Sequence, residues 1–539
     1  MPQHKPRPRS GTALLGSLLL VAAGAGALGA VPAAASAPAA ATPLGQIVPA
    51  PAKATAGGSA YKITEKTRIR VDDGSRDARR VGDYLAGVLR PSTGYKLPVT
   101  DDHAGSGDGI RLELSKKDKG LGAEGYRLTS TGRSVTIVAR EAAGLFHGVQ
   151  TLRQQLPATV EASSRQSGPW LVAGGTIEDS PRYGYRSAML DVSRHFFTVE
   201  QVKRYIDELA LYKINKLHLH LSDDQGWRIA IDSWPNLATY GGSTQVGGGA
   251  GGHYTKAQYK DIVRYAASRY LEVVPEIDMP SHTNAALASY ADLNCDGVAP
   301  PLYTGTEVGF SSLCVNKDIT YDFVDDVVRE LAAITPGKYL HIGGDEAHST
   351  SQADYVTFMN KVQPIVAKYG KTVVGWHQLT GATPAKGALA QYWGTEGTSA
   401  AEKAQVAEAA KNGTGLVISP ADRTYLDMKY TKDTPLGLSW AGYVEVQRSY
   451  DWDPGNYLPG APSSSVRGVE APLWSETLST SANIEYMAFP RLPGVAELGW
   501  SPAATHDWDT YKVRLAAQAP RWDALGIGYY KSPQVPWTS

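Results

Sequence analysis

Cysteine is scarce in this sequence, with only two among 539 residues. Two thiols cannot build a disulfide-rich scaffold or a four-thiolate zinc site. An excess of charge of one sign is absent as well, because 53 lysines and arginines balance 53 aspartates and glutamates and the formal net charge is zero. This balance argues against a nucleic acid or an anionic membrane as the main partner, so we expect no nucleic-acid binding.

Apolar and aromatic residues, by contrast, are abundant. Hydrophobic residues make up 42% of the chain, which contains 12 Trp, 29 Tyr and 7 Phe. This composition is sufficient for a large buried core and excludes disorder as the main state. At about 100–200 residues per domain the length suggests roughly two to four units, although a single α/β barrel can use about 250 residues or more.

The first 37 residues have the pattern of a secretory signal peptide. Basic residues between His4 and Arg9 precede an apolar run over residues 13–31, and small residues at 33–37 offer cleavage sites. A retained membrane anchor is the alternative. Because no later stretch reaches about 18 consecutive apolar residues, we expect a secreted, extracellular protein with no membrane partner after signal cleavage.

Export also bears on the two cysteines. Disulfides persist in oxidising compartments, so we expect a bond between Cys295 and Cys314. Closing this loop would contribute about 3 kcal/mol to stability. A free reactive thiol is the alternative.

The region before residue 181 divides into two parts. Residues 38–58 are rich in alanine and proline and predict a linker, whereas residues 59–180 mix strand and helix patterns without regular alternation. The strand-like runs are 61–71, 110–114 and 134–139, and the helical stripes are 81–89 and 145–156. This mixture predicts a small non-catalytic α+β domain over residues 59–180, and we find no acid–base cluster in it.

From residue 181 to residue 539 short apolar runs alternate with amphipathic helical stretches. The eight runs are 187–192, 216–221, 271–277, 339–343, 372–376, 388–393, 415–419 and 466–474, and a helical pattern over 511–525 would close the ring. Continuous apolar strands that alternate with helices indicate a parallel sheet. Eight of them predict a (β/α)8 TIM barrel.

Chemistry in such a barrel belongs at the C-terminal ends of the strands. The side chains found there are carboxylates, one arginine, one histidine and several aromatic rings: Arg194, Asp223, Asp224, Asp278, His282, Asp345, Glu346, Trp376, Trp393, Tyr425, Asp427, Trp474 and Glu476. Tryptophan faces stack on the apolar faces of pyranose rings, and charged groups bind the hydroxyls. The combination is typical of a carbohydrate site, although any single tryptophan is as readily explained by core packing.

The densest motif is His341-Ile-Gly-Gly-Asp345-Glu346. Two glycines after an apolar strand permit a tight exit and close approach by a ligand. Electrostatic coupling of the two adjacent carboxyls should keep one ionised and push the other towards protonation, as a general acid requires at neutral pH. An isolated Asp-Glu pair is usually solvated surface, but after H-x-G-G at a strand end it is specific.

At this point the sequence resembles the glycoside hydrolase family 20 β-N-acetylhexosaminidases of secreted bacterial type. Residues 341–346 look like the family signature, and residues 190–196, 219–227 and 278–283 are similar to its other blocks, in the expected order. The resemblance covers roughly residue 60 to the C-terminus. It includes the α+β domain that these enzymes carry ahead of the barrel.

The resemblance implies exo-acting hydrolysis of terminal non-reducing N-acetyl-β-hexosamines from chitin oligosaccharides or glycans. Catalysis would be substrate-assisted and retaining: the sugar's own acetamido oxygen attacks the anomeric carbon and forms an oxazolinium intermediate. Glu346 would act as general acid and then base, Asp345 would hold the acetamido N–H, and Tyr425 would donate to the acetamido oxygen. We expect a monomer that needs no cofactor.

The family pattern also assigns residues around the sugar. They are Arg194, Asp427 and Glu476 at the ring hydroxyls, Trp376, Trp393, Trp440 and Trp474 in the pocket wall, and the pair Asp223 and His282, which would tune Glu346. A short pocket with an arginine and a glutamate at its floor favours a terminal sugar. Donors aimed in advance stabilise charge as it forms.

Two weaker patterns are discounted. Gly247, Gly249 and Gly252 fit a nucleotide-binding string, but no strand precedes them, and we expect a loop on the barrel rim instead. His218 and His220 share one face of a strand and suggest a metal pair. No third ligand has suitable spacing, so we expect no metal.

Two alternatives stand beside the substrate-assisted enzyme. One is a retaining barrel glycosidase with Glu476 as a carboxylate nucleophile facing Glu346. The other is a secreted glycan-binding protein without catalysis. The sequence leaves open the preference for N-acetylglucosamine or N-acetylgalactosamine, the preferred chain length and the natural polymer.

Overall fold

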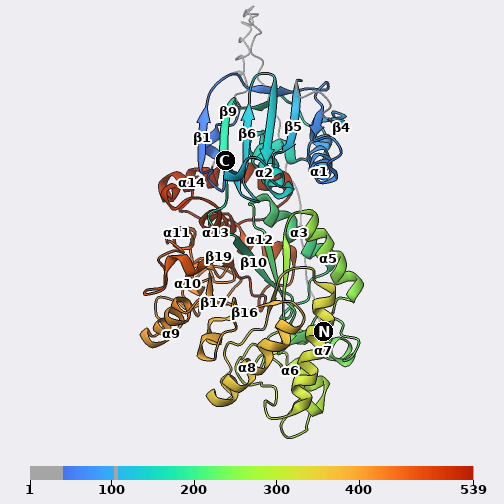
Figure 1. The fold of residues 1–539 in the computed structure, drawn as a ribbon, viewed down its shortest axis with the longest axis vertical. Coiled ribbons are helices and arrows are strands. Elements are labelled where there is room, and N and C mark those ends of the chain that lie inside the picture. Colours follow the sequence, from blue (N-terminus) through green and yellow to red (C-terminus); the bar gives the residue numbers. More distant parts are fainter. Residues whose placement is uncertain (1–40, 102–106, 538–539) are drawn as a thin grey trace, which may run out of the picture. The chain divides into compact units, whose positions relative to one another are not determined.

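The computed structural model describes residues 41–101 and 107–537, and the predicted signal peptide lies outside them. A small α+β domain, blue to cyan in Figure 1, precedes a closed barrel drawn in green to red. No helix of these two described stretches is long and apolar enough to cross a membrane.

The small domain is built on a mixed sheet, which has seven strands within the described residues in the order β1-β9-β6-β7-β5-β3-β4. The strands are β1 (Lys53–Ala56), β3 (Ile69–Val71), β4 (Val99–Asp101), β5 (Gly109–Leu114), β6 (Tyr126–Ser130), β7 (Ser134–Ala139) and β9 (Gly175–Asp179). Pairing is antiparallel from β1 to β7 and parallel from β7 to β4. Helices α1 (Arg76–Thr93) and α2 (Ala142–Gln155) pack on the sheet and on each other.

Two boundaries in this region differ from the expectation. Strand β1 lies inside the segment expected to be a linker, where it pairs with β9. All four of its side chains are exposed, so no hydrophobic alternation marks it in the sequence. The run at 61–71 is two strands, because a turn closed by the Thr67 hydroxyl separates β2 (Tyr61–Ile63), which pairs with β8 (Trp170–Val172), from β3.

The eight runs expected after residue 181 form a closed parallel barrel in chain order. Its strands are β10 (Tyr185–Asp191), β11 (Lys216–His220), β14 (Glu272–Glu276), β15 (Tyr339–His341), β16 (Thr372–Trp376), β17 (Leu389–Tyr392), β18 (Gly415–Ile418) and β19 (Val466–Ala471). Strand β19 pairs with β10 and closes the ring. The predicted (β/α)8 barrel is therefore confirmed.

The helices between the barrel strands have defined starts. Both α3 (Val199–Leu211) and α5 (Lys256–Ser268) begin with a capping box, in which a threonine and a glutamine satisfy free backbone N–H groups of the first turn. The other long helices are α7 (Asp318–Ile334), α8 (Gln352–Lys368), α9 (Ala400–Lys411), α12 (Ser481–Ala488) and α13 (Arg491–Trp500). Short elements in the loops are β12 (Ser222–Asp223), β13 (Gly226–Trp227), α4 (Asn236–Thr239), α6 (Asn284–Ser289), α10 (Ala421–Thr424) and α11 (Val446–Tyr450).

The last helical pattern, over residues 511–525, is two helices rather than one. They are α14 (Trp508–Ala516) and α15 (Ala519–Leu525). Pro520 lies in the first turn of α15. Proline has no backbone N–H and is tolerated at the start of a helix but not inside one, so a new helix begins here.

Candidate active site

A cavity of about 460 Å³ opens at the C-terminal ends of the barrel strands. Its lining residues are Arg194, His282, Thr306, Val308, Asp345, Glu346, Trp393, Tyr425, Asp427, Leu438, Trp440, Trp474 and Glu476. All but three of these were predicted from the sequence. Of the predicted residues, Asp223 and Trp376 stand behind the lining, where they support residues that reach the cavity.

The two adjacent carboxyls leave β15 through a sharp turn. Gly343, Gly344 and Glu346 have φ angles of 65°, 102° and 47°, in the left-handed region that favours glycine. A Cβ atom on Gly343 would lie 1.7 Å from Asp278 Oδ1, and Gly344 N–H donates to the same oxygen at 3.1 Å. The turn therefore needs glycine at 343, and Asp278 holds it in place.

The environment separates the acidities of the pair. Asp345 is only 7% exposed, and burial, together with the negative charges of Glu346 and Glu276, raises its pKa to about 6 against the opposing charge of His282. For Glu346, burial acts in the same direction, but the hydrogen bond and charge of His282 outweigh it and lower the pKa. The sequence predicted that the two carboxyls would shift each other's pKa, and it assigned the raised pKa to the general acid, Glu346. In the structure the raised pKa belongs to Asp345 instead.

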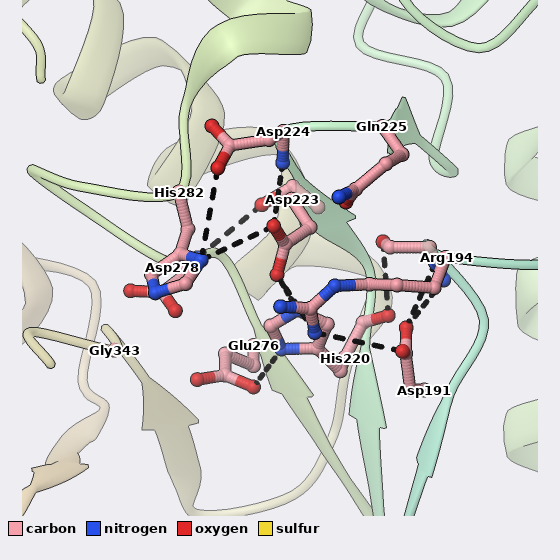
Figure 2. A network of polar contacts seen from close by, with 12 residues as sticks. Asp191, Arg194, His220, Asp223, Asp224, Gln225, Glu276, Asp278, His282 and Gly343 are labelled. Atoms are coloured by element: carbon pink, nitrogen blue, oxygen red, sulfur yellow. Dashed lines mark hydrogen bonds and ion pairs between the residues drawn. The ribbon is translucent and has the colours of Figure 1, made fainter. Parts of the chain in front are cut away.

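His282 belongs to a buried ionic cluster (Figure 2), and it connects this cluster to Glu346. Its Nε2 lies 3.3 Å from Glu346 Oε2 and 3.7 Å from Asp345 Oδ2, and its Nδ1 lies 3.2 Å from Asp223 Oδ1. Asp223 Oδ2 is 2.9 Å from Arg194 Nη1. Burial opposes ionisation of Asp223, but Arg194 and His282 outweigh it and hold its pKa well below the ordinary value.

Several polar atoms of the site are buried without a hydrogen-bond partner among the described residues. They include Arg194 Nε, Asp345 Oδ1, Asp427 Oδ2 and Glu476 Oε2. Burial, followed by the charge of Glu476, raises the pKa of Asp427, and burial also raises the pKa of Glu476 against the charge of Arg194. Unsatisfied buried polar groups are rare, and a cluster of them beside one cavity indicates a ligand with many hydroxyl or amide groups.

Aromatic rings form the remaining walls. Trp440 is 55% exposed at the mouth and makes edge contacts with Trp393 and Tyr425, with ring centroids 6.0 and 5.9 Å apart. Trp393 is held by a 3.0 Å hydrogen bond from its Nε1 to Gln378. Trp376, expected in the wall, is fully buried and packs at a tilt against Trp474, with ring centroids 5.7 Å apart, so it supports the wall rather than facing the cavity.

The sequence did not reveal one wall of the cavity. Thr306 and Val308 belong to the loop closed by a disulfide between Cys295 and Cys314. Gln225 Nε2 fastens this loop by donating to the carbonyl of Gly305 at 2.8 Å. The predicted disulfide is present, but nothing in the pattern of a Gly/Pro-punctuated loop indicates that its middle faces the site.

Arg228 is a second residue that the sequence did not single out. Its buried guanidinium donates to five backbone carbonyls, two after β10 and three in the glycine-rich loop: Val192, Ser193, Gly242, Thr244 and Gly252. In the same loop, the N–H of Val246 donates a hydrogen bond to the Arg194 carbonyl at 2.9 Å. Arg228 therefore ties the discounted glycine string to the strand end that carries Arg194.

Four groups of histidines and carboxylates within the described residues are compact enough to hold a metal ion. One of them joins His218 to Glu276 and His341, so the third ligand that the sequence did not show comes from a different strand. Both ring nitrogens of His218 are already bonded to carboxylates, at 2.8 and 3.0 Å. These mutual hydrogen bonds account for the grouping.

A TIM barrel whose strand ends surround such a polar, aromatic-walled cavity with paired carboxyls has the architecture of a glycoside hydrolase. The family model described as "Glycosyl hydrolase family 20, catalytic domain" matches residues 183–354 and 349–503, and the model "Glycosyl hydrolase family 20, domain 2" matches residues 45–180. The chain therefore belongs to glycosyl hydrolase family 20, as the sequence motifs predicted.

Individual relatives agree. A β-N-acetylhexosaminidase of Cellulomonas fimi is 42% identical over 90% of this chain and 95% of its own length. The structure of the family 20 β-N-acetylhexosaminidase from Streptomyces coelicolor A3(2) is 76% identical, with a TM-score of 0.91 over 93% of this chain and 100% of that one. A mutant β-hexosaminidase of Streptomyces plicatus, solved with its product GlcNAc, has the same identity and TM-score over 93% and 99% of the two chains.

Proposed function

We propose that this glycoside hydrolase is an exo-acting β-N-acetylhexosaminidase that releases terminal non-reducing N-acetyl-β-hexosamines. One observation carries the proposal: Asp345, Glu346 and Tyr425 line a single cavity whose other lining groups include buried, unpartnered atoms of Arg194 and Glu476. Such a cavity suits one polyhydroxylated ring, and the β-N-acetylhexosaminidase activity of the relatives supports the same substrate class.

The reaction would proceed without an enzyme nucleophile. Glu346 protonates the leaving oxygen while the C1–O bond breaks and the acetamido oxygen bonds to C1. Asp345 accepts a hydrogen bond from the acetamido N–H and stabilises the positive charge that develops. Tyr425 donates a hydrogen bond from its hydroxyl to the acetamido oxygen. Water then attacks C1 as Glu346 takes its proton, the bond to the acetamido oxygen breaks, and the sugar leaves with its original configuration.

Substrates with and without the acetamido group test this mechanism. A chromogenic N-acetyl-β-glucosaminide should be cleaved, whereas the matching β-glucoside should not, because it lacks the attacking oxygen. Equal rates on the two would contradict the proposal. Initial rates on the N-acetyl-β-galactosaminide, measured beside the gluco epimer, would decide the epimer preference, and rates on chitin oligosaccharides would decide the preferred length.

We also infer that the mature protein is secreted as a monomer after removal of the N-terminal signal. The charged, apolar and small-residue pattern of residues 1–37 supports export, and the disulfide suits an oxidising compartment. N-terminal sequencing of protein recovered from culture medium tests the cleavage, and light scattering tests the monomer. An intact N-terminus on cell-bound protein would contradict secretion.

A further inference from the structure

Below the cavity, the barrel interior contains an unusual run of buried ionisable groups. Strand β11 places His218 and His220 two residues apart, so both side chains point to the same side, and both are completely buried. The neighbouring strand β14 contributes Glu276, and β19, which lies on the other side of β10, contributes Glu470; both glutamates are also completely buried. None of these four residues lines the cavity.

These residues connect to the site through consecutive hydrogen bonds. Glu470 Oε1 is bonded to His218 Nδ1 at 2.8 Å, and His218 Nε2 to Glu276 Oε2 at 3.0 Å. The same Glu276 oxygen is bonded to His220 Nδ1 at 2.5 Å. We call the six residues Glu470, His218, Glu276, His220, Asp223 and His282 the carboxylate–imidazole chain.

The upper part of the carboxylate–imidazole chain reaches Glu346. His220 Nε2 is bonded to Asp223 Oδ2 at 2.7 Å, and Asp223 Oδ1 to His282 Nδ1 at 3.2 Å. Figure 2 shows this part, from Glu276 through His220 and Asp223 to His282. The remaining nitrogen, His282 Nε2, faces Glu346 Oε2 at 3.3 Å.

The hydrogen bonds of the carboxylate–imidazole chain fix how many protons its histidines carry when the carboxyls are ionised. A carboxylate oxygen can only accept, so each of the five hydrogen bonds takes its proton from a ring nitrogen, provided that all the carboxyls are ionised. His218 and His220 then carry protons on both nitrogens. Burial opposes this charge, but the carboxylates outweigh it and raise the pKa of each imidazole to about 10.

The geometry points to His220 and Glu276 as positioning residues that keep a proton on His282 Nε2, from which Glu346 draws the proton that it gives to the leaving group. This inference rests on the proposed function. The proton moves from Nε2 to Glu346 Oε2 and then to the leaving oxygen, which takes the electron pair of the C1–O bond. Water returns a proton to Glu346 in the second step, and His282 recovers its own.

The surroundings of His220 leave it few alternatives. Its ring faces Glu276 and Asp223 through its nitrogens, and Asp278 belongs to the same compact group. The indole of Trp474 lies against the ring, with centroids 4.9 Å apart. If Glu276 lost its charge, His220 could keep only one N–H, and Asp223 would lose either a partner or its orientation towards His282.

A series of leaving groups tests the inference in the variant Glu276→Gln. A general acid usually contributes about 10²–10⁴-fold, so partial loss of its proton supply should lower kcat/KM by roughly 10- to 100-fold when the leaving alcohol is weakly acidic. For a dinitrophenyl leaving group, which needs no protonation, we expect less than about a threefold change. Glu208→Gln removes another buried glutamate, on α3, and should affect both substrates equally and little.

His220→Gln should give the same dependence on the leaving group, because the amide can still donate to Asp223 but not also to Glu276. A loss of equal size for all leaving groups, in both variants, would overturn the inference. It would leave the proposed function intact if the wild type still distinguishes the N-acetylglucosaminide from the plain glucoside. Failure of that distinction in the wild type would instead overturn the proposed function.

A measurement on the wild type tests the charge of the two rings directly. In protein labelled with ¹⁵N-histidine, His218 and His220 should each show two protonated ring nitrogens at pH 8, where an ordinary imidazole with a pKa of about 6.5 carries one N–H. His218→Gln and His220→Gln assign the signals. A single proton on either ring at this pH would show that the carboxylate–imidazole chain is not charged as the geometry requires and would overturn the inference.

Discussion

The two buried sheets of this protein contain different kinds of side chain. In the small domain, β6 and β7 bury every second residue, and Leu128, Val135 and Ile137 form part of an apolar core with α2. In the barrel, β11 buries all five of its residues, and two of them are histidines bonded to glutamates. Buried charge is unfavourable unless paired, so these histidines need their glutamate partners, whereas the apolar residues of β6 and β7 need only close packing.

The largest effect should come from Glu346, where the polar interior meets the cavity. Glu346→Gln keeps the shape of the side chain but can neither donate nor accept the proton, so kcat/KM should fall roughly 10²–10⁴-fold. The melting temperature should change little. Assays with a chromogenic N-acetyl-β-glucosaminide and thermal melts would measure both, and undiminished turnover would exclude Glu346 as the acid.

Asp345→Asn should also cause a large loss, roughly 10²–10³-fold, if the carboxylate stabilises charge that develops in the transition state. The loss should appear mainly in kcat, because the substrate's amide is still bound. Asp453→Asn, outside the cavity, is a control for loss of an aspartate charge. A defect confined to KM would argue that Asp345 only binds.

The loss of activity at low pH should also depend on Asp345. Burial and the nearby carboxylates raise the pKa of Asp345 to about 6, so its ionised form is lost as the pH falls through that value. Activity should then decrease about tenfold per pH unit below 6, whereas an ordinary aspartate would keep it down to about pH 4. Rates between pH 4 and 8, with the folded state monitored in parallel, would show where activity is lost. A loss of activity that begins only near pH 4 would contradict a raised pKa for Asp345.

The smallest effect on catalysis should come from the small domain. Leu128 is 1% exposed, and Leu128→Ala should lower the free energy of unfolding by roughly 2–5 kcal/mol by leaving a cavity in the apolar core. We expect the folded variant to keep the wild-type kcat. Denaturant unfolding and steady-state kinetics measure the two properties separately. A tenfold fall in kcat of fully folded variant would show that the two regions are not separable in this way.

Patterns local in the sequence predicted much of this molecule. The barrel strands are visible as apolar runs because nearly all of their residues are buried, and the acid pair is visible because glycines mark the end of β15. The helix break before α15 and the exposed strand β1 were missed, since one depends on a single proline and the other on backbone pairing alone.

Contacts between distant segments could not be predicted in the same way. Glu276 and Glu470 look like isolated polar residues in apolar runs until the barrel closes and brings them to His218. The same holds for Val308, which a disulfide loop carries to the cavity, and for Arg228, whose partners are backbone carbonyls without any sequence signature. The acidity order of Asp345 and Glu346 likewise depends on His282, which comes from a different loop.

The glycines of this chain are not equivalent as targets for engineering. Gly87 faces open space in the middle of α1, and an alanine there has room and a better helix propensity. At Gly343 even one methyl group would collide with Asp278 and force the backbone out of its left-handed turn. Any other residue at position 343 should therefore give a folded but inactive protein. The alignment of Asp345 and Glu346 depends on the absence of a Cβ atom at this position.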